Sequence, residues 1–193
     1  MKKGFFILVL FALATSGVFA QRQSSGGIGA GLQLGLSIPV GDYSNHAGNM
    51  IVCGFFTFVT HTFFEVNLGY NFGWGSVGSI DITRRDFFFS ALGKFPFDMG
   101  AFTLFPLAGL GINMVQAWSF NGESVRRDLL PNPNLFISAG AGADFDLGSR
   151  VFIRPSLLFD INLRYLGNNP HHENLGPIMS VMPRVRTAIG FRI

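Results

Sequence analysis

The sequence predicts an all-β fold, a transmembrane eight-stranded antiparallel up-and-down β-barrel preceded by an N-terminal signal peptide. The chain of 193 residues is 48% hydrophobic and only 13% charged, whereas a soluble domain carries roughly 25% charged residues. Eight segments alternate apolar and polar or small residues with the period of two that is typical of strands. No apolar run after residue 20 approaches the ~18–20 residues that a membrane-spanning helix needs, so a chain of this composition would cross a bilayer with strands.

The first 20 residues are typical of a secretory signal peptide. Two lysines precede an apolar core at residues 5–14, and Val18 and Ala20 occupy the small-residue positions of a cleavage site. A retained N-terminal anchor is the alternative. We therefore expect a signal peptide at 1–20, a short periplasmic tail at 21–26, and the barrel at 27–193.

Eight strands follow from the alternation and from the turn residues between them. The expected strands are 28–38, 50–60, 64–74, 87–95, 102–118, 135–147, 151–163 and 180–193. Tight turns at 60–62, 96–100 and 148–150 alternate with polar loops at 39–48, 75–86, 119–134 and 165–177. Long loops at one rim, with short turns and both chain ends at the other, are the plan of a small membrane barrel. The segment 50–60 has no charge on either face, so the sequence does not orient it.

The charges of the strands all fall in the polar columns. These residues are Glu65, Lys94, Asp144, Asp146, Arg154, Asp160, Arg164, Arg184, Arg186 and Arg192. A soluble eight-stranded barrel also alternates, but its outer face meets water and carries charged residues. A lipid-facing outer wall explains the pattern, since an Arg or Lys facing the bilayer midplane costs roughly 2–4 kcal/mol.

Counting residues across the hairpins predicts ion pairs in the lumen. Glu65 should lie near Lys94, Asp144 should face Arg154, and Asp160 should lie near Arg184 or Arg186. An eight-stranded barrel has an interior barely wide enough for side chains, so these charges would fill it. Many inward positions are glycine, however, and they could instead leave a cavity.

Aromatic residues gather at the two ends of the predicted strands. The girdle at the loop side is expected to contain Tyr70, Phe72, Trp74, Trp118 and Tyr165. A second group at the short-turn side contains Phe64, Phe95, Phe97, Phe102, Phe145 and Phe191. Two such girdles are expected at the two membrane interfaces. The alternative is that these rings form the core of a soluble sandwich.

No arrangement in the sequence points to catalysis, a cofactor or a metal. The single cysteine, Cys53, excludes an internal disulfide and a zinc site built on several cysteines. The run His171-His172-Glu173 is a weak metal candidate, and Ser, His and Asp are too scattered for a triad. No nucleic-acid-binding motif occurs. The mixed charges at 81–86 and 123–128 would be solvated loops, or would bind lipopolysaccharide phosphates or a host surface.

The chain resembles the small eight-stranded outer-membrane β-barrel family of diderm bacteria, which includes the OmpA transmembrane domain, OmpX, OmpW and the opacity-type proteins. The most specific likeness is the C-terminal assembly signal, carried by Arg186, Ala188, Phe191 and Ile193. Ala188 stands where glycine is usual, and Ile193 stands where phenylalanine is usual.

The resemblance implies a monomer in the outer membrane of a diderm bacterium, surrounded by lipid and recognised by the outer-membrane assembly machinery. We expect a structural or surface-exposed role without catalysis, and a lumen largely filled by paired charges. The alternatives are a narrow pore or conduit for small hydrophobic molecules, as in OmpW, and a loop-borne enzyme, adhesin or surface antigen that contacts a host surface.

Overall fold

The computed structural model describes residues 26–40, 49–124, 133–164 and 178–193, and it is built from β-strands. Eight long strands are β1 Gly27–Val40, β2 Met50–Thr60, β3 Phe64–Val77, β4 Ile80–Lys94, β6 Thr103–Phe120, β8 Asn134–Asp146, β9 Val151–Arg164 and β10 Ile178–Arg192. Two short strands are β5 Phe97–Asp98 and β7 Glu123–Ser124. No helix in the described part of the chain is long and apolar enough to cross a membrane.

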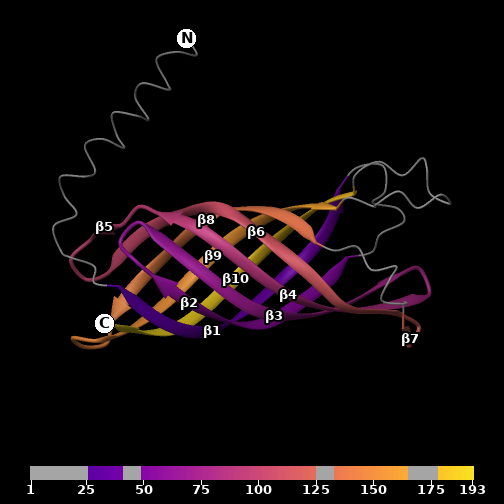
Figure 1. Ribbon diagram of the computed structural model, residues 1–193, viewed down its shortest axis with the longest axis horizontal. Coiled ribbons are helices and arrows are strands. Elements are labelled where there is room, and N and C mark those ends of the chain that lie inside the picture. The colour runs from indigo at the N-terminus through magenta and orange to yellow at the C-terminus, as the bar shows by residue number, and fades with distance from the viewer. Residues whose placement is uncertain (1–25, 41–48, 125–132, 165–177) are drawn as a thin grey trace, which may run out of the picture.

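The eight long strands close into an antiparallel barrel (Figure 1). Each pairs with its neighbours in chain order, and β1 also pairs with β10 from Gly27 opposite Arg192 to Val40 opposite Met179. The Ile193 amide donates to the Gly26 carbonyl at 2.8 Å, so the two ends of the described barrel meet at the rim of short turns. The predicted all-β, eight-stranded antiparallel barrel is confirmed.

Several sequence predictions lie outside the described residues. They are the signal peptide at 1–20, all of the tail at 21–26 except Gly26, the girdle residue Tyr165, the His171-His172-Glu173 run, the charges at 126–128, and the loops at 41–48 and 165–177.

The strands β3 and β4 extend much further than the sequence predicts. The expected polar loop at 75–86 is wrong, because Val77 pairs with Ile80 across a two-residue turn at Gly78 and Ser79. Gly78 has a φ of 60°, which suits glycine in a tight hairpin turn. A strand beyond the apolar wall has no buried face to impose alternation, so its sequence resembles a loop while its ladder of hydrogen bonds continues.

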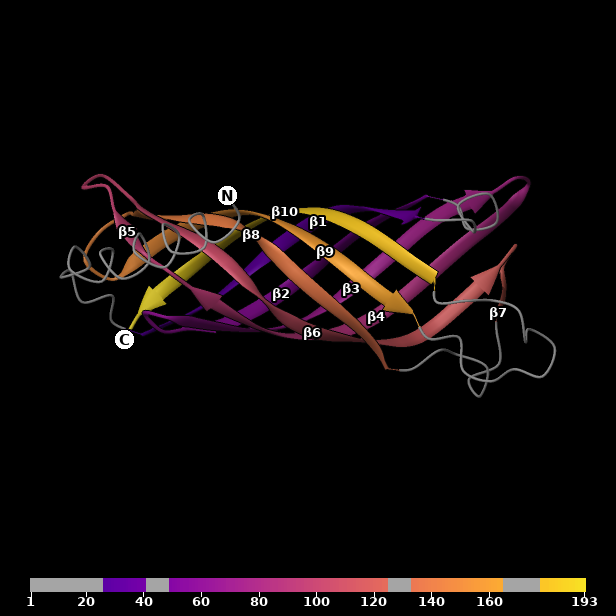
Figure 2. The same cartoon turned by 90° about the horizontal axis from the view of Figure 1, so that it is seen from above.

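The connection after β6 is also partly structured. The predicted loop at 119–134 is wrong at its start, because β6 continues to Phe120 and pairs with β7 through a turn at Asn121 and Gly122. The β3–β4 hairpin and β7 project at the end opposite the C-terminus (Figure 2). The predicted turn at 96–100 forms a smaller hairpin, in which β5 pairs with β6.

The predicted division between the inner and outer columns is confirmed where the strands are described. The columns that begin with Ile28, Phe64 and Leu135 face outward, and their partners face the lumen. The structure also orients β2, where Phe56 and Phe58 are 2% exposed and point inward. The lumen therefore holds aromatic rings as well as charges.

Each of five inward phenylalanines lies directly opposite a glycine on a neighbouring strand. The pairs are Gly29–Phe58, Gly69–Phe88, Gly111–Phe136, Gly142–Phe105 and Gly190–Phe152. The rings cover these glycines so closely that a Cβ on Gly111 would lie 2.1 Å from Cζ of Phe136. The glycines thus make room for the rings, and at these positions they leave no cavity.

We predict that Gly111→Ala destabilises the barrel by roughly 1–3 kcal/mol, because the new methyl group overpacks a site that the Phe136 ring and the Phe89 carbonyl already fill. Equilibrium unfolding in urea from lipid vesicles measures the change. The matched control is Gly93→Ala, where a Cβ meets only the Ala108 carbonyl at 3.5 Å. Equal stability of the two variants would contradict the packing described above.

Candidate functional site

The lumen at the short-turn side is built around Arg154 on β9. Its Nε and Nη2 bind the two oxygens of Asp144 on β8, at 2.6 and 2.7 Å. Its Nη1 binds the Glu65 carboxylate, which reaches across from β3. Arg154 and Glu65 are 2% and 1% exposed. The guanidinium fork therefore ties three strands together, and two of its bonds make the bidentate contact that arginine forms well.

The middle of the lumen contains two more arginines, both from β10. Arg186 donates to Asn67 Oδ1 at 2.5 Å and lies 3.6 Å from the Glu65 carboxylate. Arg184 pairs with Asp160 at 2.6 Å and donates to Gln33 Oε1 at 3.2 Å. These contacts join β10 to strands on the opposite wall as well as to its neighbours.

Aromatic rings surround the lumen cations. The Arg154 guanidinium lies 4.7–5.0 Å from the ring centres of Phe58, Phe105 and Phe152. The Arg186 guanidinium lies 3.8 Å from the ring centre of Phe56. In this network the four cations Lys94, Arg154, Arg184 and Arg186 face the three carboxylates Glu65, Asp144 and Asp160. Contacts with ring faces help to stabilise the excess positive charge.

The structure confirms two of the three predicted ion pairs. Asp144 binds Arg154, and Asp160 binds Arg184. The predicted Glu65–Lys94 pair is wrong, because Lys94 donates to Thr60 Oγ1 at 2.9 Å and Glu65 is bound by the two arginines. The cause is the position of the turn at Gly78 and Ser79, which sets Glu65 opposite Leu92.

The phenylalanines of the lumen are the residues that sequence reasoning missed. Most of them stand between large apolar residues that face outward, as Phe136 does between Leu135 and Ile137. Alternation alone therefore does not distinguish a ring on the outer wall from one that fills the interior. The available signal is a glycine directly across the ladder, and it becomes readable only once the strand register is known.

The loop-side mouth of the lumen is apolar around one ion pair. Arg84 and Asp86 bind each other at 2.5 Å. Beside them lies a cluster of buried side chains, Met50, Val52, Ile82 and Met182, with Trp118 packed against it. The cavity at this level has a volume of about 10 Å³, which is about the space of a single water molecule.

Trp118 does not belong to the outer girdle, so that prediction is wrong. Asp86 pairs with Val115 while Arg85 pairs with Ala117, which leaves Gln116 as an extra residue on β6. This bulge reverses the alternation beyond it. As a result Trp118 lies opposite the inward Arg84 and joins the inner cluster.

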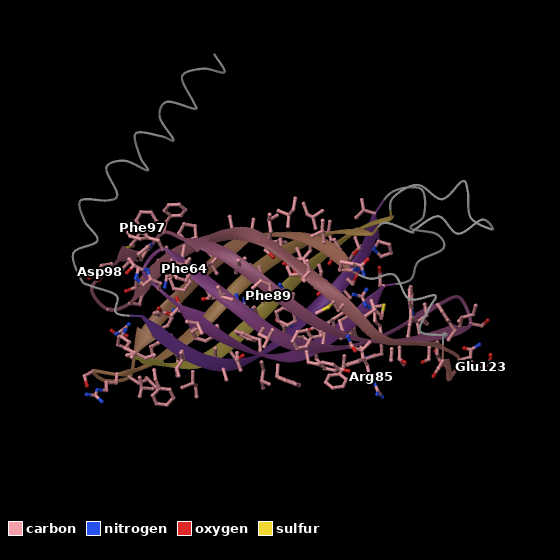
Figure 3. All side chains as sticks on the ribbon, viewed as in Figure 1. Phe64, Arg85, Phe89, Phe97, Asp98 and Glu123 are labelled. Carbon is pink, nitrogen blue, oxygen red and sulfur yellow. The ribbon has the colours of Figure 1, made fainter. Side chains whose placement is uncertain are left out.

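The outer wall is apolar and has aromatic residues near both ends. At the loop side, Phe72 and Trp74 are exposed, and Tyr70 contacts Phe72 edge to face at 5.0 Å. At the short-turn side, Phe64, Phe95, Phe97, Phe145 and Phe191 are exposed. Figure 3 shows Phe64 and Phe97 near one end and Phe89 near the middle of the wall. This placement agrees with two predicted girdles.

The four residues of the predicted assembly signal fall on both faces of β10. Arg186 and Ala188 are buried in the lumen, whereas Phe191 and Ile193 are 53% and 81% exposed on the outer wall. The alternation along β10 that turns Arg186 into the lumen thus places the apolar end of the predicted signal on the outer wall.

The described residues contain no group of three or more His, Cys, Asp or Glu side chains that could hold a metal ion. Among the described residues, the only histidine is His61. Its ring stacks on the Phe64 ring, with 5.1 Å between the ring centres. Cys53 is a partly exposed free thiol on β2.

Comparison with solved structures identifies the fold. Neisserial surface protein A superposes with a TM-score of 0.56 at 10% identity, covering 87% of this chain and 97% of that one. The attachment invasion locus protein Ail of Yersinia pestis gives 0.46 at 14% identity, covering 89% and 99%. The outer membrane enzyme PagL gives 0.43 at 14% identity, covering 82% and 97%. No protein-family model and no curated protein matches the sequence.

These findings define the class of the fold. The chain has the fold of a small outer-membrane eight-stranded β-barrel, as Neisserial surface protein A does. At these identities the likeness extends to the fold and no further.

We predict that Arg154→Ala costs about 3–5 kcal/mol of folding free energy, because it leaves Glu65 and Asp144 as buried carboxylates without their main partner. Arg192→Ala is the matched control. It breaks the Arg192–Asp146 pair at 2.6 Å, in which the two side chains are 23% and 44% exposed, so its cost should stay below about 1 kcal/mol. Urea unfolding of both variants in vesicles tests the contrast, and similar losses would contradict it.

Proposed function

We propose that this protein is a monomeric integral outer-membrane β-barrel with a structural or surface-exposed role, and that its lumen is closed to solutes. The main support for a closed lumen is its filling. Buried arginines lie against phenylalanine rings at successive levels, from the short-turn rim towards the loop-side mouth. Side chains of this size fill the interior of an eight-stranded barrel.

The outer wall supports the membrane location. Its exposed residues are large and apolar over all eight long strands, and an exposed apolar surface of this extent requires a partner that excludes water. Outer-membrane lipid would supply such an environment, and the polar loops and turns would then lie on either side of the lipid. The projecting β3–β4 hairpin supports the surface-exposed part of the role, since it continues past the apolar wall.

A narrow pore receives less support from the geometry. Conduction would need a continuous path past Arg154, Arg186 and Arg184, each of which is 2% exposed and held by hydrogen bonds or ion pairs. Two large hollows in the described part of the chain, near Leu34 and near Ala30, lie on the outer wall, where acyl chains would cover them.

We predict that the refolded protein gives no steady single-channel current in a planar bilayer. The double variant Phe56→Ala/Phe136→Ala removes two fully buried rings from the lumen and should produce conducting events. The matched control is Phe55→Ala/Phe89→Ala, which removes two exposed rings from the outer wall and should stay silent. Steady currents from the unaltered protein would refute the closed lumen.

We also predict that deletion of Phe191 to Ile193 blocks membrane assembly. The deletion removes the closing pairs Ile28–Phe191 and Gly27–Arg192 and the bond from Ile193 to Gly26, together with the apolar end of the signal that the assembly machinery would read. Membrane fractionation and heat-modifiable migration on gels report assembly. Ile189→Ala, an exposed position on the same strand, should assemble normally. A heat-modifiable truncated barrel in the membrane fraction would contradict the prediction.

A further inference from the structure

One cation interrupts the apolar outer wall. Along the described strands, the outward columns hold only two charged residues, Arg85 and Asp81, and both belong to the extended part of β4. Asp81 lies nearer the hairpin tip. Arg85 comes directly before the outward ring of Phe87 in the same column, so it is the charge that lies at the edge of the wall.

Polar side chains that also face outward lie near Arg85 on β4 and β6. The bulge on β6 leaves both Gln116 and Ala117 exposed beside it. Next along the strands, the hydroxyls of Thr83 and Ser119 share a hydrogen bond at 2.6 Å. On the other side, Arg85 lies opposite the girdle residue Phe72. The result is a small polar patch, Arg85, Gln116, Thr83 and Ser119, beside the aromatic girdle, because Phe72 and Trp74 lie opposite Arg85 and Thr83.

The position of this patch along the barrel matches a membrane interface. Ten residues of the chain separate Arg85 from Phe95, the outward ring at the short-turn end. At about 3.3 Å per residue and a strand tilt of about 40°, they span about 25 Å along the barrel axis, which equals the height of the apolar band in outer-membrane barrels. Figure 3 shows Arg85 between the mid-wall Phe89 and Glu123 at the loop end, with its side chain directed away from the barrel.

Arg85 forms no ion pair with a carboxylate in the described ranges, in contrast to Arg84, which binds Asp86 inside the mouth. A guanidinium at a lipid interface without a protein anion is suited to bind phosphate, because its planar fork matches two phosphate oxygens. We propose that Arg85, with Gln116 and the Thr83–Ser119 hydroxyls beside it, binds the anionic phosphate of a lipid headgroup in the loop-side leaflet. The contact would fix the depth of the barrel on this side. The proposal rests on the membrane location proposed above.

Native mass spectrometry of the barrel ejected from phosphatidylcholine nanodiscs that contain a minority of phosphatidic acid tests the site. The unaltered barrel should retain phosphatidic acid in preference to phosphatidylcholine. Arg85→Gln should lower that retention about five- to tenfold, since one charge-assisted contact is lost. Arg85→Lys should keep most of it. Arg150→Gln, which removes an exposed cation at the short-turn rim, should leave it unchanged.

Three results would overturn the proposal. They are no preference for phosphatidic acid in the unaltered protein, equal retention by the Arg85→Gln variant, or loss of the bound lipid to excess inorganic phosphate, which would make free phosphate the ligand. Heat-modifiable migration of every variant separates these results from failure of the membrane location, because a chain that does not insert shows no folded band in the first place.

Discussion

The closure of β1 on β10 is the constraint on which the rest of the structure depends. Once eight strands form a continuous ladder, the interior has a fixed width that admits side chains and little else. Every inward residue then competes for space with residues on the opposite wall. The glycines opposite Phe58, Phe88 and Phe152 follow from this limit, because two large side chains cannot share one cross-strand position.

The same narrow interior explains the form of the charge network. A buried carboxylate is costly unless a charged or hydrogen-bonding partner meets it, and the short diameter brings partners from opposite walls within reach. Glu65 on β3 therefore binds arginines from both β9 and β10. The rings that lie against these guanidinium groups occupy much of the space between them.

The outer wall differs from the lumen, because a wall that faces lipid, as proposed above, would exclude charged side chains without limiting the size of apolar ones. Large apolar residues predominate there, and hollows remain where small residues such as Ala30 and Thr57 face outward. Towards the loop-side end of the barrel, charged side chains also face outward. The β3–β4 hairpin carries charge on both faces there, with Arg84 turned to the mouth and Arg85 turned outward.

The sequence by itself determined the strand count, the faces of seven strands and the Asp144–Arg154 pair, because alternation and a three-residue turn are local properties of the chain. The tertiary structure alone decided the partners of Glu65, the inward direction of Phe56 and Phe58, and the place of Trp118. These depend on register and on a bulge, and a shift of two residues in one hairpin exchanges Lys94 for two arginines as the partners of Glu65. Local pattern fixes which face a residue takes, whereas only the closed barrel determines what it meets across the lumen.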